Sequence, residues 1–260
     1  MGIRSVERAL SVLQEMNLQP YTSVGHLHAR TGLPKPTLVR ILQTLEHAGY
    51  VENDPRLGGY QLSALVSSLS SGYHKEPMVV EAGRPWAIAL TRKHQWPVSI
   101  SLLDRDAVVV RFSTVPDSSV SPFHKTVNMR LPLITRGMGL AYLAFAAPEE
   151  FDLIVGMLRK SEDPEDELAR HPEKLDRLIA LTRERGYAIR SPQVEPRNSN
   201  TIAVPVFNDN GRVVASLGLT YFTSAFSSQT EACERYASVL KSASQEISKD
   251  LARLNKSSLI

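Results

Sequence analysis

The chain has 260 residues, of which 42% are hydrophobic and 22% charged, with a net charge of +3 and an isoelectric point near 9.0. This composition is that of a folded protein with a substantial core, and it excludes a uniformly basic coat. The single cysteine, Cys233, excludes a disulfide framework and a cysteine-based zinc site. The charged N-terminal segment and the lack of an apolar run of about 18 residues predict a cytoplasmic protein without a membrane span.

The first quarter of the chain has the pattern of a winged helix-turn-helix, a module that places one helix in the DNA major groove. We expect a first helix with Val6, Ala9, Leu10 and Leu13 on its apolar face, a second over 24–30, a third from Lys35 to about residue 47, and short strands at 50–52 and 60–62. Gly32 suits the end of the second helix, and Gly58-Gly59 closes the turn of the wing.

The third helix is the predicted recognition helix. Its apolar stripe leaves Thr37 and Arg40 on other faces, one turn apart in the part of the helix that reads bases. Arginine can donate two hydrogen bonds to a guanine, whereas Lys35 suits a phosphate. The predicted DNA-contact residues are Thr22, Ser23, Lys35, Pro36, Thr37, Arg40 and Arg56.

An alternative is that these side chains are only the solvated faces of a small helical domain. Residues 1–62 contain six basic and five acidic side chains, so the net charge of about +1 gives weak support for DNA binding. The acids, however, lie in the first helix, at the end of the third helix and on the first strand of the wing. The predicted docking end therefore keeps the basic residues.

The segment that follows the wing is rich in serine, which is compatible with a flexible linker. Leu62, Leu65, Val66 and Leu69 nevertheless keep helical spacing, and this favours a linker helix. Because helix-turn-helix proteins usually read two half-sites as dimers, Leu65 and Leu69 are candidates for a dimer contact. They could equally pack on their own domain.

The remainder of the chain predicts a mixed α and β domain. A helix is expected over 79–94, followed by strands at 98–102 and 107–112. Further helices are expected over 137–146, 148–159 and 172–185, then a hairpin of 201–207 and 213–221 around Asn208-Asp209-Asn210-Gly211, and a terminal helix from about Ser228.

Catalytic motifs are absent from the sequence. There is no glycine-rich phosphate loop after a strand, no His-Glu-x-x-His and no Gly-x-Ser-x-Gly. Cys233 lies among acidic residues, which disfavours its thiolate, and His26 and His28 cannot share one helical face as a metal pair. We therefore expect no enzyme, no metal and no cofactor.

Taken in order, several segments resemble the IclR family of bacterial transcriptional regulators. They are VERALSVLQEM, LHARTGLPKPTLVRILQTLEHAGYV, DPRLGGYQL, RLPLITRGMGLAYLAF, RGYAIR and NTIAVPVFNDNGRVVASLGLTY. The resemblance covers essentially the whole chain. The stretches WPVSISLLDRDAVVVRFST and SPFHKTVNMRLPL are most similar to the branch that activates hydroxyphenylpropionate catabolism.

This resemblance implies a GAF-like effector domain, with about six antiparallel strands flanked by helices, that binds a small aromatic or carboxylic metabolite. The implied pocket residues are Gly137, Met138, Gly139, Ala203, Pro205, Gly218 and Thr220. Ile134 and Leu140 stand where many members have His and Lys, which predicts a more apolar pocket. Candidates for the effector carboxylate are Arg111, His124, Arg130 and Arg136, with His124 the first choice.

The sequence thus predicts an α+β protein with three parts: a winged helix-turn-helix over 1–63, a linker helix over 64–77 and a GAF-like effector domain over 78–260. The expected partners are operator DNA, a small aromatic carboxylic acid, one or three further copies of the chain and, for an activator, RNA polymerase. Activation of an aromatic-acid operon is favoured over repression. The rival hypothesis is an enzyme whose N-terminal domain only docks to proteins.

Overall fold

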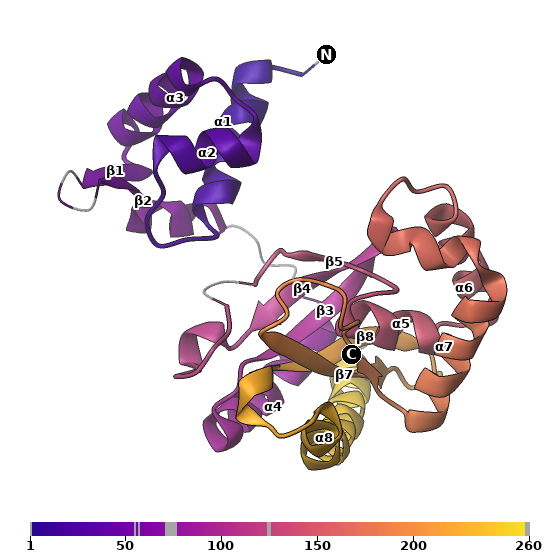
Figure 1. Ribbon diagram of the computed structural model, residues 1–260. Helices are drawn as coiled ribbons and strands as arrows, with labels where there is room; N and C mark the ends of the chain where they lie inside the picture. Colours follow the sequence, from indigo (N-terminus) through magenta and orange to yellow (C-terminus); the bar gives the residue numbers. More distant parts are fainter. Residues whose placement is uncertain (1, 55, 57, 71–76, 124–125, 258–260) are drawn as a thin grey trace. The chain divides into compact units, whose positions relative to one another are not determined.

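A computed structural model describes residues 2–54, 56, 58–70, 77–123 and 126–257. The chain divides into two compact units, Met1–Glu76 and Pro77–Ile260 (Figure 1). Each unit has its own hydrophobic core, so the α+β fold class and the two-part organisation follow directly from the packing. We describe the two units separately.

The first unit contains three helices and a two-stranded antiparallel hairpin. They are α1 (Arg4–Met16), α2 (Val24–Thr31), α3 (Lys35–His47), β1 (Val51–Asp54) and β2 (Gly59–Leu62). The Ser23 side chain caps α2 by accepting a hydrogen bond from the His26 amide, and Gly32 ends α2 in the left-handed conformation with φ of 67°. These elements and their order are those of the predicted winged helix-turn-helix.

The buried face of α1 differs from the prediction. Val12, Leu13 and Met16 enter the core, whereas Val6 is 51% exposed and Leu10 is 53% exposed. Only the C-terminal half of α1 therefore packs against α2 and α3. The apolar residues of its first half remain on the surface of the unit.

The predicted linker helix is a 3-10 helix, η1, over Ala64–Ser70, and residues 71–76 of the predicted segment lie outside the described residues. Ser63, directly before η1, competes for backbone hydrogen bonds, because its hydroxyl donates to the Gly49 carbonyl and accepts from the Leu65 amide. Leu65 and Leu69 are both exposed. Neither leucine is buried in the core of the first unit.

The second unit is built on a six-stranded antiparallel sheet in the order β5-β4-β3-β8-β7-β6. The strands are β3 (Val98–Asp104), β4 (Ala107–Ser113), β5 (Arg130–Pro132), β6 (Ala188–Ile189), β7 (Ser199–Phe207) and β8 (Val213–Phe222). The long β7–β8 hairpin and β3 form its centre, and the short strands β5 and β6 lie at its edges.

Helices cover both faces of this sheet (Figure 1). On one face, α4 (Met78–His94) and α8 (Gln229–Ser257) pack on Ile202, Val204, Leu217 and Leu219. On the other face lie α5 (Gly137–Phe145), α6 (Pro148–Leu158) and α7 (Pro172–Arg185), with the 3-10 helix η3 (Pro164–Arg170) between α6 and α7. Two shorter 3-10 turns, η2 (Val115–Asp117) and η4 (Thr223–Ala225), complete the unit.

Glycines allow α5 to approach the sheet more closely than other residues would. A Cβ atom on Gly137 would lie 2.8 Å from the Thr201 carbonyl oxygen, and one on Gly139 would lie 2.1 Å from the Pro132 carbonyl oxygen. Both neighbouring atoms are backbone atoms, which cannot move aside without distorting a strand. The first turn of α5 is therefore fixed against β5 and β7.

We predict that Gly139→Ala lowers the free energy of unfolding by about 2 kcal/mol or more, because the new methyl group overlaps backbone atoms. Gly156→Ala in α6 is the matched control, since nothing lies within 4 Å of the added atom. The control should be neutral or stabilise by up to about 1 kcal/mol through helix propensity. Urea unfolding of the two variants measures both, and equal effects would contradict the close-approach argument.

Candidate DNA-binding face and effector cavity

The N-terminal half of α3 presents basic and polar side chains on its surface. Lys35, Pro36 and Arg40 are exposed and Thr37 is half-buried, while Leu38, Leu42 and Leu45 fix the opposite face in the core. No acidic residue lies in the first turn of α3. Among the described residues, neither Lys35 nor Arg40 forms an ion pair, so both cations are available to an external partner.

A groove between α1 and α3 adds a residue that the sequence analysis did not select. It has a volume of about 360 Å³, and Arg8 and Ser5 of α1 face it together with Thr37 and Arg40 of α3. Arg8 was missed because the helical pattern of α1 alone does not show which of its polar residues lies beside α3. The predicted base-reading pair, Thr37 and Arg40, thus has a basic neighbour in Arg8.

Three other predicted contact residues have different surroundings. Thr22 is only 2% exposed and pairs with Tyr60 of β2 through its backbone, which is at odds with a phosphate contact by its side chain. Ser23 is exposed, but its hydroxyl caps α2. Arg56 is exposed at the turn of the wing, where its amide donates to Asp54.

The second unit contains a cavity of about 150 Å³ beside the first turn of α5. It lies between that turn, the loop before β5, the strands of the sheet and the segment that follows β6. The lining residues are Ser99, Val110, Phe123, Thr126, Met129, Leu131, Arg136, Gly137, Met138, Arg190, Glu195, Pro196, Thr201 and Thr220. Most of the wall is apolar, and the charged residues are confined to Arg136, Arg190 and Glu195.

The structure brings Gly137, Met138 and Thr220 of the predicted pocket residues to this cavity. The other four described residues, Gly139, Ala203, Pro205 and Gly218, are not in its wall and act in packing. Gly139 lies against Pro132, and a Cβ on Gly218 would be 2.7 Å from Met138 Cγ. Ala203 and Pro205 are buried partners of Gly218 and Ser216 in the β7–β8 ladder.

His124 lies outside the described residues, so its predicted role stays a prediction. Ile134 and Leu140 do not line the cavity, because both are buried in the core between α5, α6 and α7. The apolar character predicted from these two positions therefore belongs to the core. The cavity owes its own apolar wall to other residues, including Phe123, Met129 and Met138.

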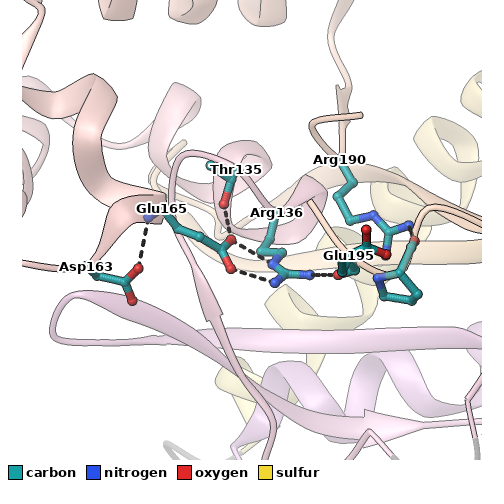
Figure 2. Close-up of polar contacts among 7 residues, drawn as sticks. Thr135, Arg136, Asp163, Glu165, Arg190 and Glu195 are labelled. Carbon is teal, nitrogen blue, oxygen red and sulfur yellow. Dashed lines mark hydrogen bonds and ion pairs between the residues drawn. The ribbon is translucent and has the colours of Figure 1, made fainter. Parts of the chain in front are cut away.

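Arg136, at the N-terminus of α5, is held by a carboxylate. Its Nε and Nη2 atoms donate to the two oxygens of Glu165 at 2.9 and 2.6 Å, and its Nη1 donates to the Glu195 carbonyl at 2.8 Å (Figure 2). Thr135 donates to the same carboxylate. Burial acts to raise the pKa of Glu165, but the hydrogen bonds from Arg136 and Thr135 and the charge of Arg136 leave that pKa below its usual value.

The other predicted carboxylate-binding arginines lie away from the cavity wall. Arg130 is exposed and forms ion pairs with Asp104 at 2.5 Å and Asp106 at 2.7 Å. Arg111 is exposed, and its nearest side-chain partner is the Asn128 amide oxygen at 3.5 Å. Arg190 was not predicted, because it follows the two-residue strand β6, which is too short to show alternation. The structure places Arg190 in the cavity wall.

Three further observations concern the chemistry of the chain. Within the described residues, no three His, Cys, Asp or Glu side chains gather as a metal site would require. Burial is the main cause that raises the pKa of the Cys233 thiol, and the nearby Glu234 adds to it. A hydrogen bond with Tyr187 acts in the opposite direction but does not offset burial, so the thiol is a weak nucleophile. No described helix is both long enough and apolar enough to cross a bilayer.

A winged helix-turn-helix with an unpaired basic face, joined to a domain with an internal cavity, defines the class of ligand-responsive DNA-binding regulators. Comparison with known families agrees with this class. Residues 5–55 match the IclR helix-turn-helix domain, and residues 72–249 match the bacterial transcriptional regulator IclR C-terminal domain. The chain belongs to the IclR family. Its members are transcriptional regulators, so the rival hypothesis of an enzyme is not supported.

Similar proteins include the transcriptional regulator XynR of Escherichia coli K12, with 28% identity over 85% of this chain and 87% of XynR. The E. coli repressor YiaJ is 25% identical over 96% of this chain and 88% of YiaJ. Among solved structures, Thermotoga maritima IclR has a TM-score of 0.66 at 21% identity, covering 96% of this chain and all of that one.

A second solved structure is an IclR homologue of Microbacterium hydrocarbonoxydans complexed with 4-hydroxybenzoate. It has a TM-score of 0.63 at 21% identity over 95% of this chain and 98% of that chain. At such identities these structures establish the shared fold.

We predict that acid weakens the Arg136–Glu165 pair. The folded-state pKa of Glu165 is lowered, so its contribution to stability is present above about pH 4.5 and is lost as the pH falls through the folded-state pKa. Glu165→Gln should cost about 1–3 kcal/mol at pH 7 and less at pH 3.5. Urea unfolding across this range measures the difference, with Glu162→Gln, an exposed residue, as control. A pH-independent cost would contradict the pairing.

Proposed function

We propose that this protein binds operator DNA as a dimer and releases or remodels that complex when a small aromatic carboxylic acid occupies the cavity beside α5. The observation that carries the proposal is the unpaired basic face of α3 in a chain whose second unit encloses a ring-sized cavity. Membership of the IclR family supports the same assignment of DNA binding to the first unit and ligand binding to the second.

In the proposed DNA complex, Thr37 and Arg40 contact base edges, and Lys35 and Arg56 contact phosphates. Pro36 and Ser23 lie at the starts of α3 and α2, where the positive end of the helix dipole favours a phosphate. Arg8 joins this set because it shares a groove with Arg40. Thr22 is left out, since its side chain is buried.

Dimerisation is part of the proposal because one unit offers few basic contacts. The exposed apolar residues Val6, Leu10, Leu65 and Leu69 are the candidates for contact with a second copy. Such a dimer, or a tetramer built from two of them, would present two recognition helices to two half-sites. The effector would change the population of DNA-competent arrangements, a coupling typically worth about 1–3 kcal/mol.

We further propose that the protein acts in the cytoplasm and activates an aromatic-acid catabolic operon through RNA polymerase. The support is the resemblance of the 96–114 and 121–133 stretches to the branch of the family that activates hydroxyphenylpropionate catabolism. The relative YiaJ is a named repressor, so repression is the second candidate. In vitro transcription from an operator-containing promoter separates the two candidates. An activator with its ligand raises the amount of transcript above the amount made without the protein, whereas a repressor does not.

We predict that Arg40→Ala weakens specific operator binding by about 1–3 kcal/mol and relaxes the preference at one base position. Fluorescence anisotropy with operator and mutated-operator duplexes measures both effects. Arg177→Ala, an exposed arginine of α7, is the control and should bind operator like the parent chain. Unchanged discrimination between the duplexes would remove Arg40 from the base-reading position.

Lys35→Ala should behave differently from Arg40→Ala. Loss of one phosphate contact weakens binding to all duplexes about equally and lowers the slope of log K against log salt by about 1. The measurement is a salt titration of the parent chain and the variant on two duplex sequences. If parent binding itself does not depend on salt, the proposed DNA-binding function is wrong.

A further inference from the structure

The size and walls of the cavity beside α5 define the shape of what it holds. Its volume of about 150 Å³ equals that of engineered apolar protein cavities that bind one benzene molecule. The apolar part of the wall comes from Val110, Phe123, Met129, Leu131 and Met138. A single aromatic ring with short substituents fits this space.

The charges in the wall are unequally compensated. Arg136 is neutralised by the two hydrogen bonds to Glu165. The Glu195 carboxylate pairs with Arg197 at 3.0 Å, and both of those side chains are exposed. Among the described residues, Arg190 is the only one of the three charged wall residues without an ion-pair partner, although the charges of Glu195 and Glu165 still act on it at longer range.

Arg190 is also deeply buried, with 5% of its surface exposed. Its Nη2 atom donates to two neutral acceptors, the Pro196 carbonyl at 2.5 Å and the Ser199 hydroxyl at 3.2 Å. Its Nε atom is buried and has no hydrogen-bond partner among the described residues. A buried guanidinium without a counter-ion is costly, and an anion that enters the cavity lowers this cost.

We propose that Arg190 binds the carboxylate of the effector and that the effector is a monoanionic, single-ring aromatic acid. This inference rests on the proposed function, since it names the ligand class of the same cavity. Arg136 is a positioning residue here, because three of its five N–H groups donate to Glu165 and the Glu195 carbonyl and its charge is matched by Glu165 (Figure 2). One uncompensated cation selects one negative charge, and the apolar wall selects the ring.

A second cavity, of about 330 Å³, also includes Arg190 in its wall. Its wall combines polar residues such as Asn200, Ser227 and Gln229 with the aromatic residues Tyr221 and Phe226. We assign the ring to the smaller cavity because apolar atoms make up a larger share of its wall. The two assignments are separable, because Thr220 lines only the smaller cavity and Gln229 only the larger one.

The test measures the preference of the full-length protein for an acid over its uncharged amide. Isothermal titration with benzoate, 4-hydroxybenzoate, phenylacetate and 3-(3-hydroxyphenyl)propanoate, each paired with its amide, gives this ratio. We expect at least one acid to bind on the order of tenfold to a hundredfold more tightly than its amide. If no acid exceeds its amide, the inference is overturned.

Arg190→Met should reduce that ratio to about one, whereas Arg190→Lys should keep part of it because the positive charge remains. Arg130→Met, which removes an exposed arginine outside the wall, is the matched control and should keep the full ratio. Thermal unfolding shows that each variant is folded. If folded Arg190→Met keeps the preference for the acid over its amide, Arg190 only holds the loop through its hydrogen bond to the Pro196 carbonyl, and the proposal is overturned.

Two bulky variants locate the ring. Thr220→Phe should abolish acid binding by filling the smaller cavity, and Gln229→Trp should leave it intact. The opposite result would move the ligand to the larger cavity and overturn the assignment. Operator binding by the unmodified chain with and without the best acid is measured in parallel. If the acid binds but operator binding never responds, the proposed function fails while the role of Arg190 stands.

Discussion

The close packing of α5 on the sheet is the constraint on which the second unit depends. Because Gly137 and Gly139 carry no Cβ, the first turn of α5 lies directly on backbone atoms of β7 and of the segment around Pro132. This contact places Met138 over Gly218 and sets Arg136 at the helix N-terminus. The cavity is the space left beside this turn, and side chains including Phe123, Met129 and Met138 complete its wall.

The same packing determines how charge is distributed around the cavity. Arg136 emerges where η3 can supply Glu165, and the pair is only partly exposed. Arg190 emerges from the edge strand β6 and donates to the Pro196 carbonyl and the Ser199 hydroxyl, while Glu195 of the same loop pairs with Arg197 instead. Arg136 and Arg190 both lie in the wall of one cavity, but they differ in function because the elements that face them differ. A compensated arginine shapes the site, and an uncompensated one is free to recognise an anion.

Much of the fold could be predicted from the sequence. Amphipathic periodicity and end signals such as Gly32 and the Asn208–Gly211 turn located every long helix and both central hairpins to within a few residues. The short edge strands β5 and β6 were missed, because two or three residues cannot show alternation. The buried half of α1 was also misjudged, since Val6 and Leu10 have the right spacing but no element of the first unit covers them.

The sites were less predictable than the fold, for a physical reason. Gly137, Met138 and Thr220 were found from the family pattern, which also selected Gly139 and Gly218. Each of these positions needs a side chain that is small or that matches the shape of its surroundings. A sequence pattern does not distinguish a residue that lines a cavity from one packed behind it. Arg190 ends the RGYAIR segment of the family pattern, but the sequence indicates no role for it. Its character comes from the partners it lacks, which only the three-dimensional arrangement reveals.

The weak charge of the first unit limits how regulation can work. A net charge of about +1 means that one unit neutralises few phosphates, so a single copy gains little from counter-ion release. In the proposed dimer, most of the operator affinity comes from two recognition helices held at the spacing of two half-sites, where the second contact is effectively intramolecular. Affinity that depends on spacing is lost when the spacing changes, even if every side chain keeps its contact partner. A ligand that stabilises one arrangement of the dimer by a few kcal/mol is therefore sufficient to control DNA binding.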